Sequence, residues 1–315
     1  MLRRALLGTI LAAPALAFPD RPLRIIVAYP AGGGVDLMAR AVAQRMGQAL
    51  GQNIVIENRT GASGTIGAQA VASAAADGHT LLFATTSEMS LRPLLERQLP
   101  YNVDRDFVPI ALLGRTPVVL AVHAALPARD VAELIALARA RPGRLSYAGT
   151  GNGSLMHLTG ELFLERAGVQ ILHVPYRGAA PAVNDTAAGQ VELVFSGLPP
   201  VLPLARDGRL RILAVSTPHR FATIPEVPTM EEAGLQGFDM SNSVGLVAPR
   251  GTPEAVIATL NAAANLAAAD AGVRDIFLRN GADALGSTPE EFLAYTRSER
   301  ARFAETIRQT GMRLD

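Results

Sequence analysis

The sequence predicts an α/β fold in which strands covered on both faces alternate with helices, and three observations lead to this prediction. Short apolar runs, such as residues 23–29, lack the polar alternation of a half-exposed sheet. Helical segments separate these runs almost throughout the chain. Several runs end in a loop rich in glycine or hydroxyl residues that opens directly into a helix. We therefore expect functional residues to gather where the strands end.

The predicted strands and helices follow one another along the chain with short connections between them. The strand candidates are residues 23–29, 53–57, 80–85, 118–123, 144–147, 170–174, 191–195, 211–215 and 244–248. Helical segments between them include residues 65–76, 131–140, 154–167 and 253–269. The last long helix has a clear beginning, because Thr288 is a good N-cap, Pro289 suits the first turn and Glu291 completes a capping box. This alternation predicts parallel units with right-handed crossovers.

Two strand-like stretches, residues 117–123 and 211–216, have no sharp break around them. If both cross between lobes, residues 121–215 form a second lobe inserted into a first lobe made of residues 18–120 and 216–315. Ligands of such sheets bind beyond the carboxyl ends of the strands. Two facing sheets would then place the ligand in the cleft between the lobes.

Residues 1–17 have the pattern of an export signal, which predicts a periplasmic chain cleaved near Ala17. Arg3 and Arg4 precede the apolar residues 5–13, and the small-residue site Ala15-Leu16-Ala17 follows. The apolar stretch falls short of the ~20 residues that a membrane span needs. The arginine pair matches a twin-arginine signal only in part, so both export routes stay open.

Composition excludes several classes of function. The chain has Cys 0, so it has neither a lipid-bearing cysteine nor disulfides, and it has no lysine for Schiff-base or P-loop chemistry. A formal charge of +1 without a basic cluster argues against nucleic acid and membrane surfaces as partners. The five histidines include no close metal-binding pair. We expect a soluble monomer with no cofactor and no metal.

The first glycine loop, residues 30–34, predicts an anion site. It follows an apolar strand and precedes a helix, so its backbone N–H groups and the positive end of the helix dipole converge. The dinucleotide fingerprint G-x-G-x-x-G is missing, which favours a small anion over a cofactor. Three further strand-end loops offer similar donors, at residues 58–64, 85–87 and 149–154.

These loops and further blocks resemble a known family. The blocks are PAGGGVD at 30–36, ENRTGASG at 57–64, DGHTLL at 77–82, GTGNGS at 149–154, VPYRG at 174–178, AGQVEL at 188–193, VPT at 227–229 and APRGTP at 248–253. In this order they resemble the Bug proteins, the periplasmic substrate-binding components of tripartite tricarboxylate transporters. The resemblance covers essentially the whole mature chain. It implies a two-lobed periplasmic binding protein type II fold, the Venus flytrap, closing on a small carboxylate in the inter-lobe cleft.

By position, the resemblance implies which residues contact the ligand or its ordered waters. They are Tyr29, Ala31, Gly33, Asp36, Ser63, Thr86, Thr150, Ser154, Tyr176 and Ser196. It further implies a membrane permease of the tripartite tricarboxylate type as partner. The ligand classes are di- or tricarboxylates, acidic amino acids and aromatic carboxylates. Val35, the segment 242–244 and the pair Ser196-Gly197 depart from the family pattern, so the identity of the carboxylate does not carry over.

Other interpretations of single residues and of the whole chain stay open. Asp36 is a general base, an acceptor that orders its loop, or a residue that fixes a bound water. Arg177 either binds a carboxylate or faces solvent. His157 lies one turn into its helix and is expected to pack rather than bind. A periplasmic enzyme acting on a small carboxylate is the alternative function, although no G-x-S-x-G elbow or paired acidic motif supports it. The effector lobe of a transcription regulator would need an N-terminal helix-turn-helix, where this chain has an export signal.

Overall fold

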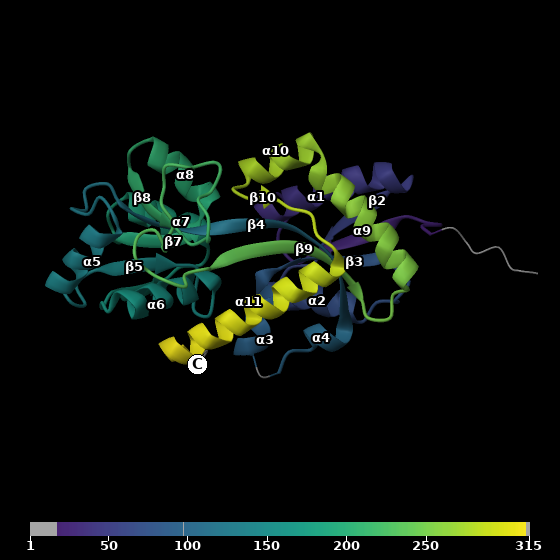
Figure 1. Ribbon diagram of the computed structural model, residues 1–315, viewed down its shortest axis with the longest axis horizontal. Coiled ribbons are helices and arrows are strands. Elements are labelled where there is room, and N and C mark those ends of the chain that lie inside the picture. Colours follow the sequence, from purple (N-terminus) through teal and green to yellow (C-terminus); the bar gives the residue numbers. More distant parts are fainter. Residues whose placement is uncertain (1–17, 97, 313–315) are drawn as a thin grey trace, which may run out of the picture.

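The computed structural model describes residues 18–96 and 98–312, so the export signal predicted for residues 1–17 lies outside them. Two lobes lie next to each other along the longest axis of the molecule (Figure 1). Each lobe contains strands with helices packed on both faces. The sheet order is β2-β1-β3-β9-β4-β7-β5-β6, with β8 and β10 paired to β4.

The first lobe is built on three parallel strands, with β1 paired to both β2 and β3. These are β1 (Leu23–Val27), β2 (Ile54–Asn58) and β3 (Thr80–Thr85). Two helices, α1 (Gly34–Leu50) and α9 (Glu254–Ala269), share one core with the β1 residues Leu23 and Ile25. On the other face, Ile26 packs in a core with α2 (Thr65–Ala72) and the start of the last helix. The smaller elements α4 (Val103–Asp106), α10 (Ala271–Arg279) and β10 (Asp283–Ala284) complete this lobe.

The second lobe repeats the pattern with β5 paired in parallel to β6 and β7. Its strands are β5 (Ser146–Gly149), β6 (Leu172–Pro175), β7 (Leu193–Gly197) and β8 (Leu210–Val215). Its helices are α5 (Val131–Ala140), α6 (Leu155–Ala167), α7 (Ala179–Ala187) and α8 (Leu198–Arg206). Two apolar clusters fill the two faces of this sheet.

One long strand belongs to both lobes. β4 (Phe107–His123) pairs antiparallel with β9 (Ser241–Pro249) as far as Pro117 and then with β7 from Val118. Both strands run from one lobe toward the other in Figure 1. The expectation of parallel pairing is therefore wrong for β4, β8 and β9, because β4 pairs antiparallel with β7, β8 and β9, and β9 pairs antiparallel with β3. The chain thus crosses between lobes inside a continuous strand rather than in a loop.

The return crossing lies further along the chain than the sequence predicts. After Ser216, the chain stays with the second lobe, where Phe221 joins one of its cores and Met230 and Phe238 join the other. The Met240 amide then donates to the Ser216 carbonyl at 2.9 Å before β9 begins. On this packing, we propose that residues 118–240 form the second lobe in place of residues 121–215.

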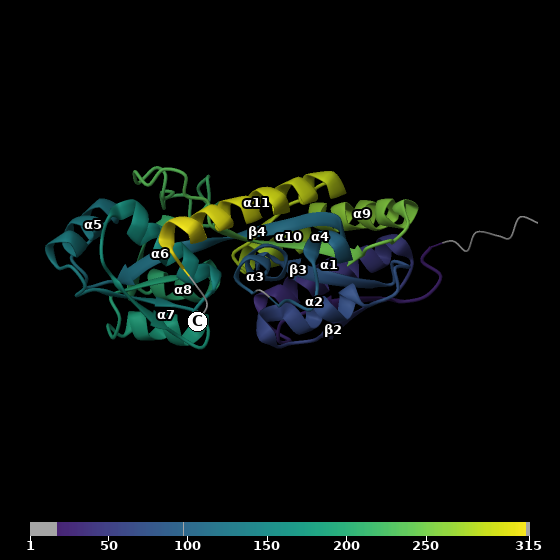
Figure 2. The same cartoon turned by 90° about the horizontal axis from the view of Figure 1, so that it is seen from below.

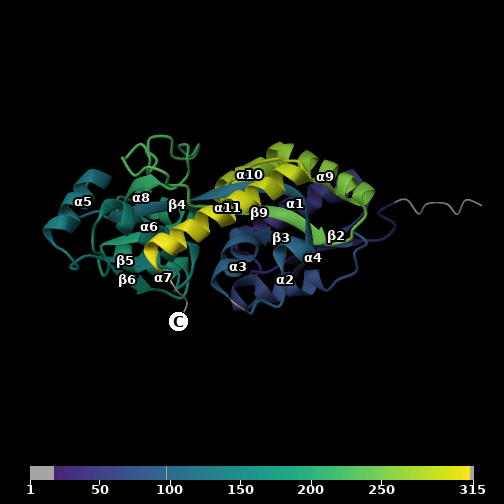
Figure 3. The ribbon, with the colours of Figure 1, turned by 60° about the horizontal axis from the view of Figure 1, so that its bottom comes forward.

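The last helix is a further connection between the lobes. α11 (Pro289–Thr310) begins with the capping box predicted from Thr288 and Glu291. Its first turns place Phe292 in the first lobe's core, whereas Phe303 packs into the core of the second lobe. Figures 2 and 3 show α11 lying along both lobes. The expectation that the C-terminal helices belong to the first lobe alone is therefore wrong for α11.

No single helix in the described part of the chain is long and apolar enough to cross a bilayer. Only α9 and α10 together reach that length and composition, with a bend of 71° between them. The buried face of α9 packs in the core of the first lobe.

Candidate functional site

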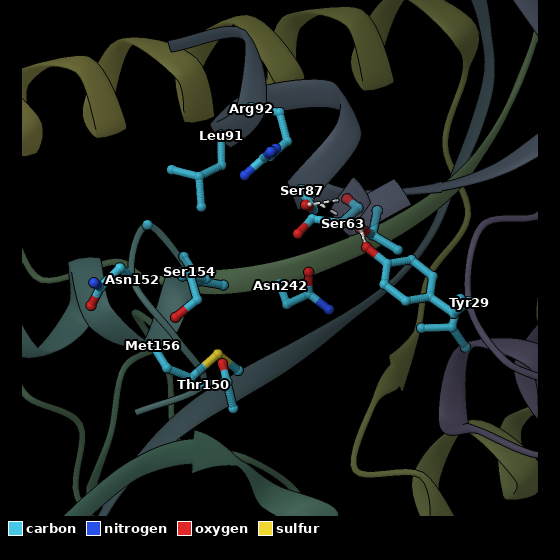
Figure 4. Close-up of a pocket in the computed structure, with 14 residues that line it drawn as sticks. Tyr29, Ser63, Ser87, Leu91, Arg92, Thr150, Asn152, Ser154, Met156 and Asn242 are labelled. Atoms are coloured by element: carbon cyan, nitrogen blue, oxygen red, sulfur yellow. Dashed lines mark hydrogen bonds between the residues drawn. The ribbon is translucent and has the colours of Figure 1, made fainter. Parts of the chain in front are cut away.

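A cavity of ≈ 310 Å³ lies between the two lobes and takes its walls from both (Figure 4). This volume is in the range of pockets that hold small molecules. The lining residues come from the ends of β1, β2, β3 and β5, from the segments that follow them, and from the start of β9. They are Tyr29, Val35, Ser63, Thr85, Ser87, Leu91, Arg92, Thr150, Asn152, Gly153, Ser154, Leu155, Met156 and Asn242.

The first lobe contributes a wall of hydroxyl groups. The Tyr29 hydroxyl lies 3.0 Å from Oγ1 of Thr85, and the Ser87 hydroxyl donates to the Ser63 carbonyl at 3.1 Å. Ser63 has a φ of 50° and Ala62 a φ of 45°, both in the left-handed region. Such conformations are costly for residues other than glycine and gather at functional sites. The unusual backbone turns Ser63 toward the cavity.

The buried carboxyl group of Glu88 accepts hydrogen bonds from Thr85 and so holds this part of the cavity wall in place. Oε2 of Glu88 accepts from the Thr85 amide and hydroxyl, each at 2.7 Å. Glu88 lies in the π-helical turn η2 (Ser87–Leu91), a geometry often found at functional sites. Burial raises the pKa of Glu88, although the hydrogen bonds from Thr85 oppose the shift. A side chain at Gly64 would overlap the Glu88 carboxyl, so this position requires glycine.

Thr86 does not line the cavity, although the sequence predicts a ligand contact there. Its hydroxyl is buried and donates to Oε1 of Glu299 at 2.9 Å, and the Ser243 amide donates to it at 2.7 Å. Its neighbours Thr85 and Ser87 line the cavity in its place. Thr86 therefore links η2 to α11 and β9 inside the protein.

The second lobe contributes the loop between β5 and α6. Ser154 is the N-cap of α6, and its Oγ accepts from the His157 amide at 3.1 Å. The hydroxyl proton of Ser154 is left to donate into the cavity, where Thr150 and Asn152 lie beside it (Figure 4). Nδ1 of His157 accepts from the Gly153 amide at 3.2 Å, so the imidazole fixes the loop from below.

His157 is supported in turn by a stack of rings. The His157 and His173 rings have centroids 4.1 Å apart and are nearly parallel, and Tyr147 stacks on the other face of His173. Burial, together with His157, lowers the pKa of His173 to about 4, so His173 is neutral at pH 7. As expected from the sequence, His157 packs beneath the loop and is not among the lining residues.

The carboxylate of Asp36 accepts hydrogen bonds within and beside the first glycine loop. Oδ2 of this buried carboxylate accepts from the Gly32 amide at 2.9 Å and from Arg40 at 2.8 Å, and Oδ1 accepts from Asn58 at 2.8 Å. Burial raises the pKa of Asp36, but these hydrogen bonds outweigh it and leave the net pKa below its usual value. Of the open interpretations of Asp36, loop ordering matches this geometry. Ala31 and Gly33 are exposed and do not line the cavity.

The remaining predicted residues also lie off the cavity surface. Tyr176 donates from its hydroxyl to Asp185 at 2.8 Å, and Ser196 is buried in the second lobe. Arg177 is exposed and lies outside the lining. The cavity therefore contains four of the ten predicted residues, namely Tyr29, Ser63, Thr150 and Ser154.

Sequence reasoning missed several lining residues. Ser87 and Asn152 stand inside loops that the sequence singled out, so the loop was found but not the side chain. Arg92 gave no signal, because it follows an unpredicted helical turn and begins α3 (Arg92–Leu95).

Comparison with known families identifies the chain's relatives. The model of the tripartite tricarboxylate transporter family receptor matches residues 38–312. The chain belongs to this family. Protein BugT of Bordetella pertussis is 39% identical over 311 residues, which cover 96% of this chain and 94% of BugT. The predicted resemblance to Bug proteins is thereby confirmed.

Solved structures of similar sequence share the fold. A Rhodopseudomonas palustris protein in complex with adipate has a TM-score of 0.83 and 35% identity, covering 94% of this chain and 99% of its own. MatC from the same species, with bound malate, has a TM-score of 0.78 and 33% identity, covering 92% and 100%. The predicted two-lobed α/β periplasmic binding protein fold is confirmed.

Proposed function

We propose that this protein is a periplasmic solute-binding protein that captures a small carboxylate between its lobes for a transporter of the tripartite tricarboxylate type. The observation that carries the proposal is the inter-lobe cavity, whose polar lining consists mainly of hydroxyl and amide groups from both lobes. Relatives solved with adipate and malate support a carboxylate as the ligand class. The export pattern of residues 1–17 supports the periplasm.

Hydrogen-bond energies are compatible with this role. Micromolar affinity corresponds to about 8 kcal/mol. A hydrogen bond to a charged group contributes roughly 1.5–3 kcal/mol, so four or five donors suffice. Thr150, Asn152, Ser154 and Asn242 line the cavity and carry side-chain donors, whereas the Ser87 hydroxyl already donates to the Ser63 carbonyl.

A ligand held by both lobes would favour a closed form. Only differential affinity shifts such an equilibrium, and moving it from 1% to 99% closed needs ~5.5 kcal/mol of preference. Two or three hydrogen bonds from the second lobe to a carboxylate are of that size. A closed form gives a membrane permease a surface that reports occupancy.

The geometry favours binding over catalysis. Nucleophilic hydrolysis needs a serine beside a general base. Ser154 instead pairs with the backbone amide of His157, whose Nδ1 is occupied by the Gly153 amide. We therefore propose that the bound carboxylate leaves unchanged.

The test is a panel of carboxylates and their neutral amides, offered to the mature protein from Phe18. We expect at least one carboxylate to raise Tm and to decrease the radius of gyration in small-angle scattering, and its amide to do neither. NMR of the recovered compound should show it intact. Conversion of the compound would favour the enzyme, and equal binding of the amide would contradict anion recognition.

A further inference from the structure

One charged side chain lines the cavity, and the function proposed above does not use it. Among the described lining residues, Arg92 alone carries a charge at neutral pH. All other polar lining groups are hydroxyls, amides and the backbone of the Gly153 loop. A carboxylate held by neutral donors alone would leave this cation without a role.

The guanidinium of Arg92 is mostly enclosed. Its side chain is only 14% exposed, and one Nη pairs with Glu96 a turn further along. Its Nε is buried and has no acceptor among the described residues. A buried N–H without an acceptor is costly, on the order of 1–3 kcal/mol. An acceptor that arrives with the ligand would remove that cost.

The position of Arg92 matches the far end of an elongated ligand. Figure 4 shows its guanidinium directed toward the space beside Leu91 and Ser87, away from the end of the cavity formed by Tyr29. In the same view Thr150 and Ser154 lie across the cavity from Arg92, and Asn242 lies between Ser154 and Tyr29. A ligand carboxylate among the hydroxyls would leave the opposite end of the molecule near Arg92.

The charges around Arg92 permit a second anion there. Glu96 is its ion-pair partner and is itself partly exposed, so the pair is reached by solvent. Glu88 is the other nearby carboxyl group, and burial raises its pKa, which favours its uncharged form. Burial lowers the pKa of Arg92, so an anion that shares the enclosed space would stabilise its charged form.

We propose that Arg92 binds the second anionic group of the ligand and that the protein thereby selects dicarboxylates over monocarboxylates of the same length. The inference rests on the proposed function, because it assumes that the first carboxylate lies among the hydroxyls. Arginine suits this role, since its planar fork of N–H donors matches the geometry of a carboxylate. Arg92 is thus a specificity-determining residue.

The test compares matched ligand pairs by calorimetry: succinate with butyrate, glutarate with valerate, and adipate with hexanoate. For the mature wild-type protein we expect the preferred dicarboxylate to bind at least tenfold more tightly than its monocarboxylate partner. Arg92→Gln should weaken the dicarboxylate at least tenfold and the monocarboxylate less than threefold. Arg92→Lys, which keeps the charge, should preserve the order of affinities even if Arg92→Gln fails to fold.

Arg105→Gln is the matched control, because Arg105 is 75% exposed and pairs with Asp106 outside the cavity. It should change neither affinity. Equal binding of both members of every pair by the wild-type protein, or an equal loss for both in Arg92→Gln, overturns the inference and leaves the proposed function standing. Absence of binding for every carboxylate overturns the proposed function itself.

Discussion

Two glycine-rich loops of this chain look alike in sequence, and they do different work in the structure. Both follow a buried strand and open a helix: residues 30–34 before α1, and residues 149–154 before α6. The second loop lines the cavity with Thr150, Asn152 and Ser154, whereas the first contributes only its flanking residues Tyr29 and Val35. The difference lies in what satisfies the loop's own donors.

In the first loop an internal carboxylate takes the place that an external anion would fill. Asp36 accepts from the Gly32 amide, so a loop that resembles an anion cradle already holds an anion. In the second loop the imidazole of His157 accepts from the Gly153 amide, and the Ser154 hydroxyl accepts from the His157 amide, so its own proton remains to donate. In the first loop, an acidic side chain of the following helix thus occupies an amide that an external anion would otherwise reach.

The largest effect on affinity is expected from removing the Ser154 hydroxyl of the second loop. Ser154→Ala should weaken carboxylate binding at least tenfold, because a hydrogen bond to a charged group contributes roughly 1.5–3 kcal/mol. It should also destabilise the fold by about 1 kcal/mol through loss of the N-cap. Gly33→Ala in the first loop is the control, because Gly33 has a φ of −74° that alanine also adopts. Its affinity for the carboxylate should stay within about twofold of wild type. Calorimetry with the best carboxylate measures both, and equal losses would contradict the assignment of the two loops.

A smaller effect is expected from a pair of glycines with similar backbones. Gly153 has a φ of 70° and Gly32 a φ of 80°, so alanine at either position costs about 1–2 kcal/mol of stability. Only Gly153→Ala should also reduce affinity, by roughly three- to tenfold, because the strained loop displaces Ser154. Thermal unfolding and calorimetry separate the two quantities. A larger affinity loss in Gly32→Ala than in Gly153→Ala would contradict this prediction and indicate that the first loop contacts the ligand.

The smallest effect on binding is expected at Asp36. Its folded-state pKa lies below the usual value of 3.8, because the hydrogen bonds from Arg40, Gly32 and Asn58 outweigh burial. Its ionised form therefore stabilises the fold above that pH, and this contribution is lost as the pH falls through the folded-state pKa. Asp36→Asn should lower Tm at pH 7, with the gap to wild type narrowing below about pH 4, and affinity should stay within about twofold. A gap that does not change with pH would show that the carboxylate charge does not stabilise the loop.

Local sequence patterns predicted the helices and strands well where the residues of one segment alone determine its structure. Residues 80–85 and 131–140 match β3 and α5, and the capping box at Thr288 is present. β4 was found only in its last six residues. Pro109, Gly114 and Pro117 interrupt the earlier apolar run, and the register of β4 against β9 shifts on both sides of Leu112. Such a strand is held by its partner, which lies far away in the sequence.

The sequence predicted most of the loops that line the cavity, but not which side chains of those loops face it. The block Thr85-Thr86-Ser87 was recognised, but the π-helical turn points Thr86 into the protein and leaves its two neighbours at the cavity. Asp36 reaches back to Gly32, a contact that depends on the loop's conformation. Arg92 reaches the cavity only because η2 leads into α3, and no local pattern announces that geometry.

The shared strands have a consequence for the order in which the chain folds. β3 has no second neighbour until Leu82 pairs with Val247, so the first lobe cannot complete its sheet before residue 249 is available. The strands of the second lobe, from Val118 to Val215, pair among themselves over much shorter separations. Contacts between distant residues form more slowly than local ones. We therefore expect the β3–β9 pairing to form late, which leaves β3, made earlier, with an open edge that is exposed to aggregation.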